Sequence, residues 1–209
     1  PGASDAKGPP ASVFGIQVKT LINDDIKALG SGGSAHHIVA VAGYAQGQGE
    51  VIYENRSIKS GTFMGVSDNY PEVENVALQS GRFFTAEEES GLARVAILGS
   101  EAANELFQGE IPLGKIIKIK HTSYKVIGEF ESRGSVAFTN QDKNIFIPLN
   151  TAQKIMLGWR HLSLIRAKID DAANVDETID SVKQILRQQH NLEGDAEDDF
   201  SVRNAAQAI

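Results

Sequence analysis

Residues 162–190 read LSLIRAKIDDAANVDETIDSVKQILRQQH and combine two hydrophobic periods. In 162–169 the apolar side chains alternate with Arg166 and Lys168, which predicts a half-exposed strand. Asn174 followed by Glu177 fits a capping box, the pattern that begins a helix. Apolar residues then recur at helical spacing up to His190, namely Val175, Ile179, Val182, Ile185 and Leu186. The stretch therefore predicts a strand followed by an amphipathic helix.

The segments on either side extend this alternation. Before it, 144–149 (NIFIPL) predicts an apolar strand with Pro148 at its end or edge, and 151–157 predicts a short helix. After it, the pattern of Phe200-Ser201-Val202 predicts a last strand over 199–203. The resulting order, strand, helix, strand, helix, strand, is typical of a sheet packed against helices.

The N-terminal part adds further strands to this half. Four extended segments are expected there, at 13–21, 38–44, 50–53 and 57–66. Gly47 and Gly49 are expected to form a turn between the second and the third of them. Asn23 is a good N-cap for a short helix over 24–29, which the Gly/Ser run at 30–34 ends.

The middle of the chain is predicted to consist of short strands, turns and short helices. Its clearest element is a hairpin of 116–120 and 124–130, with Ile117 and Ile119 facing inward. Thr85 and Glu88 fit a capping box for one helical turn, and Ser100 is expected to cap a helix. The remaining segments predict a short strand at 94–98, a turn-rich connection at 69–75 and a loop at 133–143.

These elements predict an α+β chain of two mixed α/β subdomains. One is discontinuous, 13–65 with 144–209, and the other is inserted into it at 66–143. Residues 1–12 (PGASDAKGPPAS) are expected to be a flexible arm or an expression remnant. Because the chain begins at Pro1 and not at Met, we expect it to be processed or excised from a longer protein.

Composition excludes several classes of function. The 209 residues carry 20 Lys+Arg against 27 Asp+Glu, a formal net charge of −7, which argues against nucleic acid or an anionic membrane surface as the main partner. Cys is absent, which excludes disulfides, thiolate metal sites and Cys nucleophiles. No stretch reaches the roughly 18 apolar residues expected of a spanning helix.

Titratable residues form no recognisable catalytic or metal motif. None of the five histidines, His36, His37, His121, His161 and His190, stands in a ligand spacing with a carboxylate, and ordinary structural roles are favoured for all of them. The acidic run 193–199 lacks the order of an EF-hand loop, so a solvated turn is the better interpretation. Glu87, Glu88 and Glu89 are interpreted as charges at a helix N-terminus.

Gly-rich loops and nucleophile turns are equally uninformative. Neither 30–33 nor 47–49 matches a phosphate-binding pattern, and an N-cap role accounts for Ser100. Six apolar residues are candidates for exposure, with Phe138 the best candidate for a partner contact: Phe63, Met64, Phe83, Phe84, Phe138 and Trp159. We therefore predict no catalytic, cofactor-binding or metal-binding residues, and a module that binds, bridges or transmits.

The order of several short motifs is more informative than any one of them. They are YPEVENVALQSGRFFT (70–85) with RVAILG (94–99), LF (106–107) with PLGKIIKI (112–119), YKVIG (124–128), IFIPLNTAQ (145–153) and FSVR (200–203). In this order and approximate spacing, over 13–209, the chain resembles the extracytoplasmic core domain of MacB-type ABC transporter permeases. The positions Gly81, Arg82, Gly114, Pro148 and Gln153 belong to the fold motifs of that resemblance.

The resemblance implies a domain between the first and second membrane helices of a four-helix permease, on the extracytoplasmic side of the cell membrane. It implies a split Porter-like subdomain with an inserted Sabre-like one, a homodimer, and ATP hydrolysis by a cytoplasmic ATPase domain or subunit. Some relatives work with a periplasmic adaptor. Others release lipoproteins or regulate cell-wall enzymes. The family offers no catalytic residue to carry over to this chain.

Two functions of other classes stay open from the sequence. One is a free secreted or cytoplasmic binding protein with no membrane attachment, and the other is a hydrolase that uses scattered carboxylates. Membrane spans of about 20 apolar residues on both sides of this segment in the gene would distinguish the permease domain from the first. A pocket with convergent titratable groups would support the second.

Overall fold

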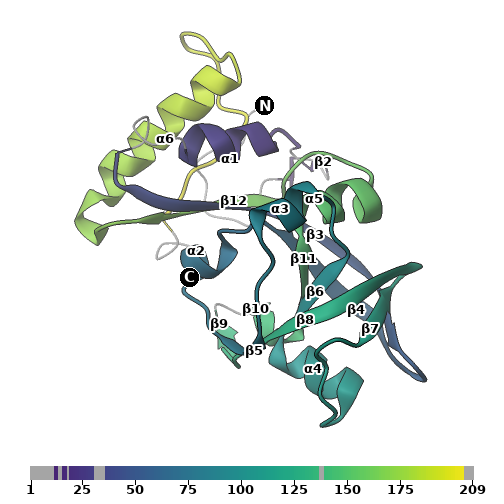
Figure 1. The fold of residues 1–209 in the computed structure, drawn as a ribbon. Helices are drawn as coiled ribbons and strands as arrows, with labels where there is room; N and C mark the ends of the chain where they lie inside the picture. The colour runs from purple at the N-terminus through teal and green to yellow at the C-terminus, as the bar shows by residue number, and fades with distance from the viewer. Residues whose placement is uncertain (1–11, 14–15, 18, 31–35, 137–138, 205–209) are drawn as a thin grey trace. The chain divides into compact units, whose positions relative to one another are not determined.

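A computed structural model describes residues 12–13, 16–17, 19–30, 36–136 and 139–204 (Figure 1). The chain divides into two compact units. The split unit combines Pro1–Val41 with His161–Ile209, and the central unit is Ala42–Arg160. Phe138 and most of the two segments predicted to be flexible, 1–12 and 30–34, lie outside the described residues.

Strands that close into a ring form the central unit. In order of pairing they are β3 (Ile38–Tyr53), whose first residues belong to the split unit, β4 (Arg56–Val66), β11 (Ile145–Pro148), β6 (Val95–Leu98), β8 (Thr122–Phe130) and β7 (Ile116–Ile119). β7 closes the ring because it pairs with β8 and also with Val51 and Ile52 of β3. β5 (Leu78–Gly81) is a further partner of β8.

The interior of this ring is a hydrophobic core. Ile117 and Ile119 of β7 are fully buried, which confirms the predicted alternation. Helix α4 (Ser100–Phe107) packs one face against the same core through Ala102, Ala103, Leu106 and Phe107. The helix begins at Ser100 and its N-cap is Gly99, one residue earlier than predicted.

Gly47 lies inside β3, so the predicted turn at Gly47 and Gly49 is wrong. A Cβ atom at Gly47 would come within 2.2 Å of Cζ of Phe63 on the neighbouring β4. Glycine is therefore required at position 47, because the Phe63 ring, which is 0% exposed, leaves no room for a side chain there. The chain does not reverse its direction at this glycine. The predicted strands 38–44 and 50–53 form one continuous strand, β3.

A second core of the central unit is mainly aromatic. It gathers Tyr44, Tyr70, Phe83, Phe84, Phe130 and Phe146. Tyr70 begins α2 (Tyr70–Glu74), a short helix with Pro71 in its first turn, where the sequence predicted only a connection. The predicted capping box is confirmed: Thr85 and Glu88 exchange side-chain and backbone hydrogen bonds at the start of α3 (Ala86–Ser90).

The split unit places helices α1 (Asn23–Gly30) and α6 (Val175–Gln189) side by side (Figure 1). Its strand β12 (Leu164–Ile169) pairs with β3. The core cluster of this unit is formed by the buried residues Leu29, Val41, Val182, Leu186 and Phe200. The strand and the helix predicted over 162–190 are thereby confirmed.

Other predicted elements of the split unit are wrong. Within the predicted strand 13–21, β1 (Ser12–Val13) pairs antiparallel with β2 (Ile16–Gln17), which reverses the chain. The predicted strand 199–203 does not form, and Phe200 is buried. A 3₁₀ turn η3 (Ala172–Asn174) precedes α6, whose N-cap Asn174 makes no side-chain capping bond, so the second predicted capping box is absent.

The remaining elements lie between β8 and β12. The segment predicted as a loop, 133–143, contains the paired strands β9 (Ser135–Val136) and β10 (Thr139–Asn140) and a 3₁₀ turn η1 (Gln141–Lys143). The predicted helix 151–157 forms as α5 (Leu149–Thr151) continued by a π-helical turn η2 (Ala152–Leu157). Pro148 ends β11, as predicted.

The fold is mixed α/β, as predicted, but the two units have other boundaries than the predicted subdomains. Residues 42–65 and 144–160 belong to the central unit. The reason is the strand pairing, because β11 pairs with β4 on one side and with β6 on the other. The assignment to Porter-like and Sabre-like subdomains stays a prediction. In the described part of the chain, no helix is long and apolar enough to cross a membrane.

Candidate functional site

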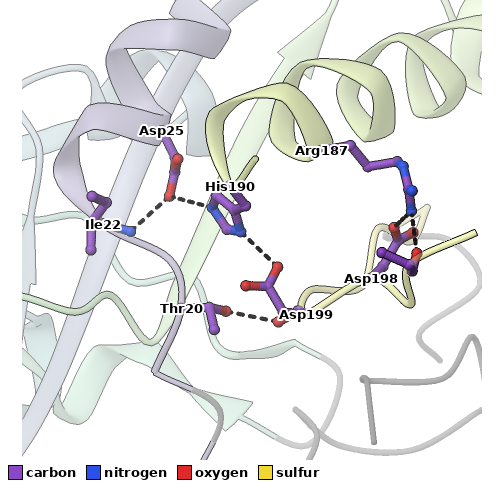
Figure 2. A network of polar contacts seen from close by, with 8 residues as sticks. Thr20, Ile22, Asp25, Arg187, His190, Asp198 and Asp199 are labelled. Carbon is purple, nitrogen blue, oxygen red and sulfur yellow. Dashed lines mark hydrogen bonds and ion pairs between the residues drawn. The ribbon is translucent and has the colours of Figure 1, made fainter. Parts of the chain in front are cut away.

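A network of polar side chains lies at the end of α6, in the split unit (Figure 2). His190, the C-cap of α6, has a carboxylate on each side of its ring. Nδ1 lies 2.6 Å from Oδ1 of Asp199, and Nε2 lies 3.3 Å from Oδ2 of Asp25. The His190 side chain is 9% exposed and that of Asp25 is 2% exposed. We call these three residues the clasp.

The clasp joins three segments that are distant in sequence. Asp25 stands in the first turn of α1, and its Oδ2 also accepts a hydrogen bond from the backbone N–H of Ile22 at 2.8 Å. The carbonyl of Asp199 accepts a hydrogen bond of 2.7 Å from the hydroxyl of Thr20. The segment 20–25, the end of α6 and the segment at Asp199 are therefore tied to one another.

Arg187, one turn before His190, holds the acidic turn that follows α6. Its guanidinium donates to the carbonyls of Gly194 and Ala196, each at 2.8 Å, and forms an ion pair with Asp198. The carboxylates of Asp198 and Asp199 thus have internal partners. The run 193–199 contains a turn, closed by a hydrogen bond from the N–H of Ala196 to the carbonyl of Glu193.

Protonation of His190 suits its surroundings. Burial of the ring lowers the pKa of His190, but the hydrogen bonds and negative charges of Asp199 and Asp25 raise it, and the net pKa is raised. An imidazolium donates from both nitrogens, whereas a neutral imidazole has one donor and one acceptor. The two carboxylates facing the ring therefore match the charged form.

A second histidine cluster lies at the start of β3. Nδ1 of His37 is 2.9 Å from Oδ2 of Asp170, and the Asn174 amide is 2.9 Å from the same nitrogen. Hydrogen bonds from Asn174 and His37 lower the pKa of Asp170 to about 2. Nδ2 of Asn174 also donates a hydrogen bond to Oδ1 of Asp170 at 3.0 Å. This cluster is more open to solvent, with His37 29% exposed.

The other histidines form no site. His36 and His121 are exposed, and His161 makes an isolated bridge with Ile22. Burial lowers the pKa of His161. Among the described residues, no group of three or more His, Cys, Asp or Glu residues is arranged to hold a metal ion. The clasp itself is unsuitable, because its carboxylates contact opposite nitrogens of one ring.

The apolar residues that were candidates for exposure differ in how far they are buried. Phe63 and Phe84 are buried, and Met64 and Phe83 pack partly buried against the aromatic core. Trp159 is exposed. The sequence did not suggest five other exposed apolar residues: Ile22, Val39, Ile111, Ile116 and Leu164.

The clasp was not predicted from the sequence. His190 was assigned an ordinary structural role, and Asp25 was only a position in the predicted helix 24–29. Asp25 precedes Leu29 by four residues, so the two share the buried face of α1. A carboxylate on a buried face needs a partner, and this was the available signal. The identity of the partner, 165 positions away, carries no local signal.

Residues 3–185 match the family described as MacB-like periplasmic core domain. The macrolide export ATP-binding/permease protein MacB of Chlorobaculum tepidum is 33% identical over 167 residues, which are 80% of this chain and 26% of that protein. The protein of the same name from Marinobacter nauticus is 30% identical over an alignment of 210 positions, which covers 100% of this chain and 30% of that protein. The chain thus spans less than a third of the length of these relatives.

Two solved structures share the fold. The periplasmic region of MacB from Actinobacillus actinomycetemcomitans has a TM-score of 0.76 at 24% identity, covering 90% of this chain and 80% of that one. The extracellular domain of the noncanonic ABC-type transporter YknZ from Gram-positive bacteria has a TM-score of 0.72 at 21% identity, covering 88% of this chain and 89% of that one. At these identities the likeness concerns the fold.

Proposed function

Because the chain belongs to the MacB-like periplasmic core domain family, we propose that it is the non-catalytic extracytoplasmic domain of an ABC transporter permease. In this role it binds partners or substrate outside the membrane and relays ATP-driven conformational change for export. ATP hydrolysis takes place in a cytoplasmic ATPase domain or subunit. The working assembly is a homodimer of the permease. In an efflux system this dimer also binds a periplasmic adaptor.

The observation that carries this proposal is the tie between segment 20–25 and the segment at Asp199. Thr20 bonds to Asp199, and His190 lies between Asp199 and Asp25. A domain inserted between two membrane helices receives their movement through its first and last segments. A polar tie between these segments makes the split unit respond to both helices together.

The substrate class follows from the relatives alone. The curated relatives are named for macrolide export, and we extend that substrate class to the permease that contains this chain. Lipoprotein release and cell-wall signalling are the alternatives within the same architecture. The extracellular domain of a noncanonic ABC-type transporter shares the fold, so the fold is not confined to MacB proteins.

The test uses the full-length permease in an efflux-deficient host, expressed together with its ATPase and any neighbouring adaptor gene. Macrolide resistance is measured for the wild type, for an ATPase-dead form and for His190→Gln. We expect resistance with the wild type, none with the ATPase-dead form, and reduced resistance with unchanged protein level for His190→Gln. Equal resistance with and without ATPase activity would contradict an export role.

The location is tested separately by protease accessibility of a tag inserted at Gly109, an exposed glycine after α4. In intact spheroplasts the tag should be cleaved from outside. The free-binding-protein alternative would be supported instead if the gene encodes no apolar span of about 20 residues on either side of this segment.

A further inference from the structure

The geometry of the clasp points to a regulatory device. We propose that His190 is a proton-operated switch, whose charged form holds segment 20–25 against the end of α6 and the segment at Asp199, and whose neutral form loosens that hold. The proposal extends the proposed function by a form of regulation. Its test is read on the 209-residue chain itself, so it stands or falls independently of any transport assay.

The donor count of the imidazole ring is the basis of the switch. Both ring nitrogens face carboxylate oxygens, which only accept hydrogen bonds. The charged ring donates to both. After loss of one proton, the contact with Asp199, at 2.6 Å, keeps the remaining N–H because it is the shorter one. The lone pair of Nε2 then faces the Asp25 carboxylate, and attraction becomes repulsion.

Asp25 is poorly placed to compensate for this loss. The oxygen that faces His190 is the one that already accepts the backbone N–H of Ile22. The Asp25 side chain is almost completely buried, so water has little access to replace the lost donor. The contact between α1 and His190 is therefore the one expected to open.

Two carboxylates face the His190 ring, and the other charged groups named here pair with one another. Asp25 faces it from α1 and Asp199 from the C-terminal segment. On α6, Arg187 is engaged by Asp198, and on the exposed side of α1, Asp24 and Lys27 pair with each other. The Phe200 ring and the imidazole are nearly perpendicular, with a centroid distance of 5.6 Å.

The direction of the pH effect follows from the raised pKa of His190. A histidine whose pKa is higher in the folded chain than in the unfolded chain adds stability that is fully present below the unfolded value, about 6.5. That stability is lost as the pH rises through the folded value. The clasp should therefore be closed in mild acid and loosened in alkaline conditions.

Amide hydrogen exchange between pH 5.5 and 9, corrected for the intrinsic rate, tests the switch. In the wild type we expect protection in 20–25 to fall by about tenfold over this range, the size expected for one charge-assisted hydrogen bond. The midpoint should coincide with the titration of the His190 ring followed by NMR. In His190→Gln, whose side chain does not titrate, protection should be low and independent of pH.

Asp199→Asn keeps an oxygen that accepts from Nδ1 but removes one negative charge. It should fold and shift the His190 midpoint and the exchange midpoint together to lower pH. Asp195→Asn, an exposed residue of the same acidic turn, is the matched control and should shift neither. The proposal is overturned if protection in 20–25 does not follow the His190 titration in the wild type, or if Asp195→Asn shifts the midpoint as far as Asp199→Asn.

Discussion

The central unit and the split unit are each stabilised internally, and the interactions that stabilise them differ. In the central unit a closed ring of strands encloses large side chains such as Phe63, Ile117 and Ile147, all fully buried. In the split unit a smaller apolar core is joined by the clasp of Asp25, His190 and Asp199. Apolar packing does not depend on pH, whereas a histidine between two carboxylates does. The stability of the clasp is therefore expected to vary with pH, whereas that of the apolar core inside the strands is not.

The largest expected effect is in the ring core of the central unit. Phe63→Ala removes a ring that contacts the Gly47 position and is completely buried. We expect a loss of about 3–5 kcal/mol in the free energy of unfolding. The measurement is the exchange of slow β8 amides against denaturant. Ile111→Ala, at an exposed site, is the control, and an equal loss there would remove the distinction between core and surface.

Breaking the clasp should have the next largest effect and should be limited to the split unit. His190→Gln at pH 6 is expected to cost about 2 kcal/mol in local stability, from the loss of charge-assisted hydrogen bonds. At pH 9 the difference from the wild type should shrink, because the wild-type ring is then neutral. Limited proteolysis at both pH values measures the opening. A constant difference would contradict the dependence on charge.

The central unit has its own titrating group, and this sharpens the contrast. Glu89 accepts a hydrogen bond from the backbone N–H of Asp68, and burial raises the pKa of Glu89 to about 7. Above pH 7 the folded unit therefore contains a poorly solvated carboxylate, which lowers stability as pH rises from about 4.5 through 7.

Glu89→Gln should stabilise the central unit at pH 8 by about 1–2 kcal/mol and have little effect at pH 4.5. Thermal unfolding at the two pH values measures this difference. Glu87→Gln, at an exposed position of the same helix, is the control. A destabilised Glu89→Gln protein at pH 8 would show that the carboxylate is better satisfied than its contacts indicate.

The smallest effect is expected for Tyr124, in the core that the closed ring of strands encloses. The Tyr124 hydroxyl is buried and has no hydrogen-bond partner among the described residues, and burial raises the pKa of Tyr124 to about 12. Tyr124→Phe should leave the free energy of unfolding unchanged or raise it by up to about 1 kcal/mol. Chemical denaturation measures this change. A loss of 2 kcal/mol would mean that the hydroxyl has a partner, such as a buried water.

Elements determined by short-range patterns were predictable. The alternation of Ile117 and Ile119 identified β7, and the pair Thr85 and Glu88 identified the start of α3. Features that depend on distant partners were not. Gly47 suggested a turn because Phe63, the neighbour that requires it, lies on another strand. Residues 199–203 alternate like a strand, yet Asp199 bonds to Thr20 and His190 instead of joining a sheet.

The central claim is that the clasp stabilises the split unit and that the central unit does not depend on it. The most direct test compares amide hydrogen exchange across the described residues in the wild type and in His190→Gln at pH 6. We predict that protection in 20–25 and near Asp199 falls by about thirtyfold, which corresponds to the roughly 2 kcal/mol expected above, while the amides of β7 and β8 are unchanged. Loss of protection that is equal in both units, or absent from 20–25, would contradict it.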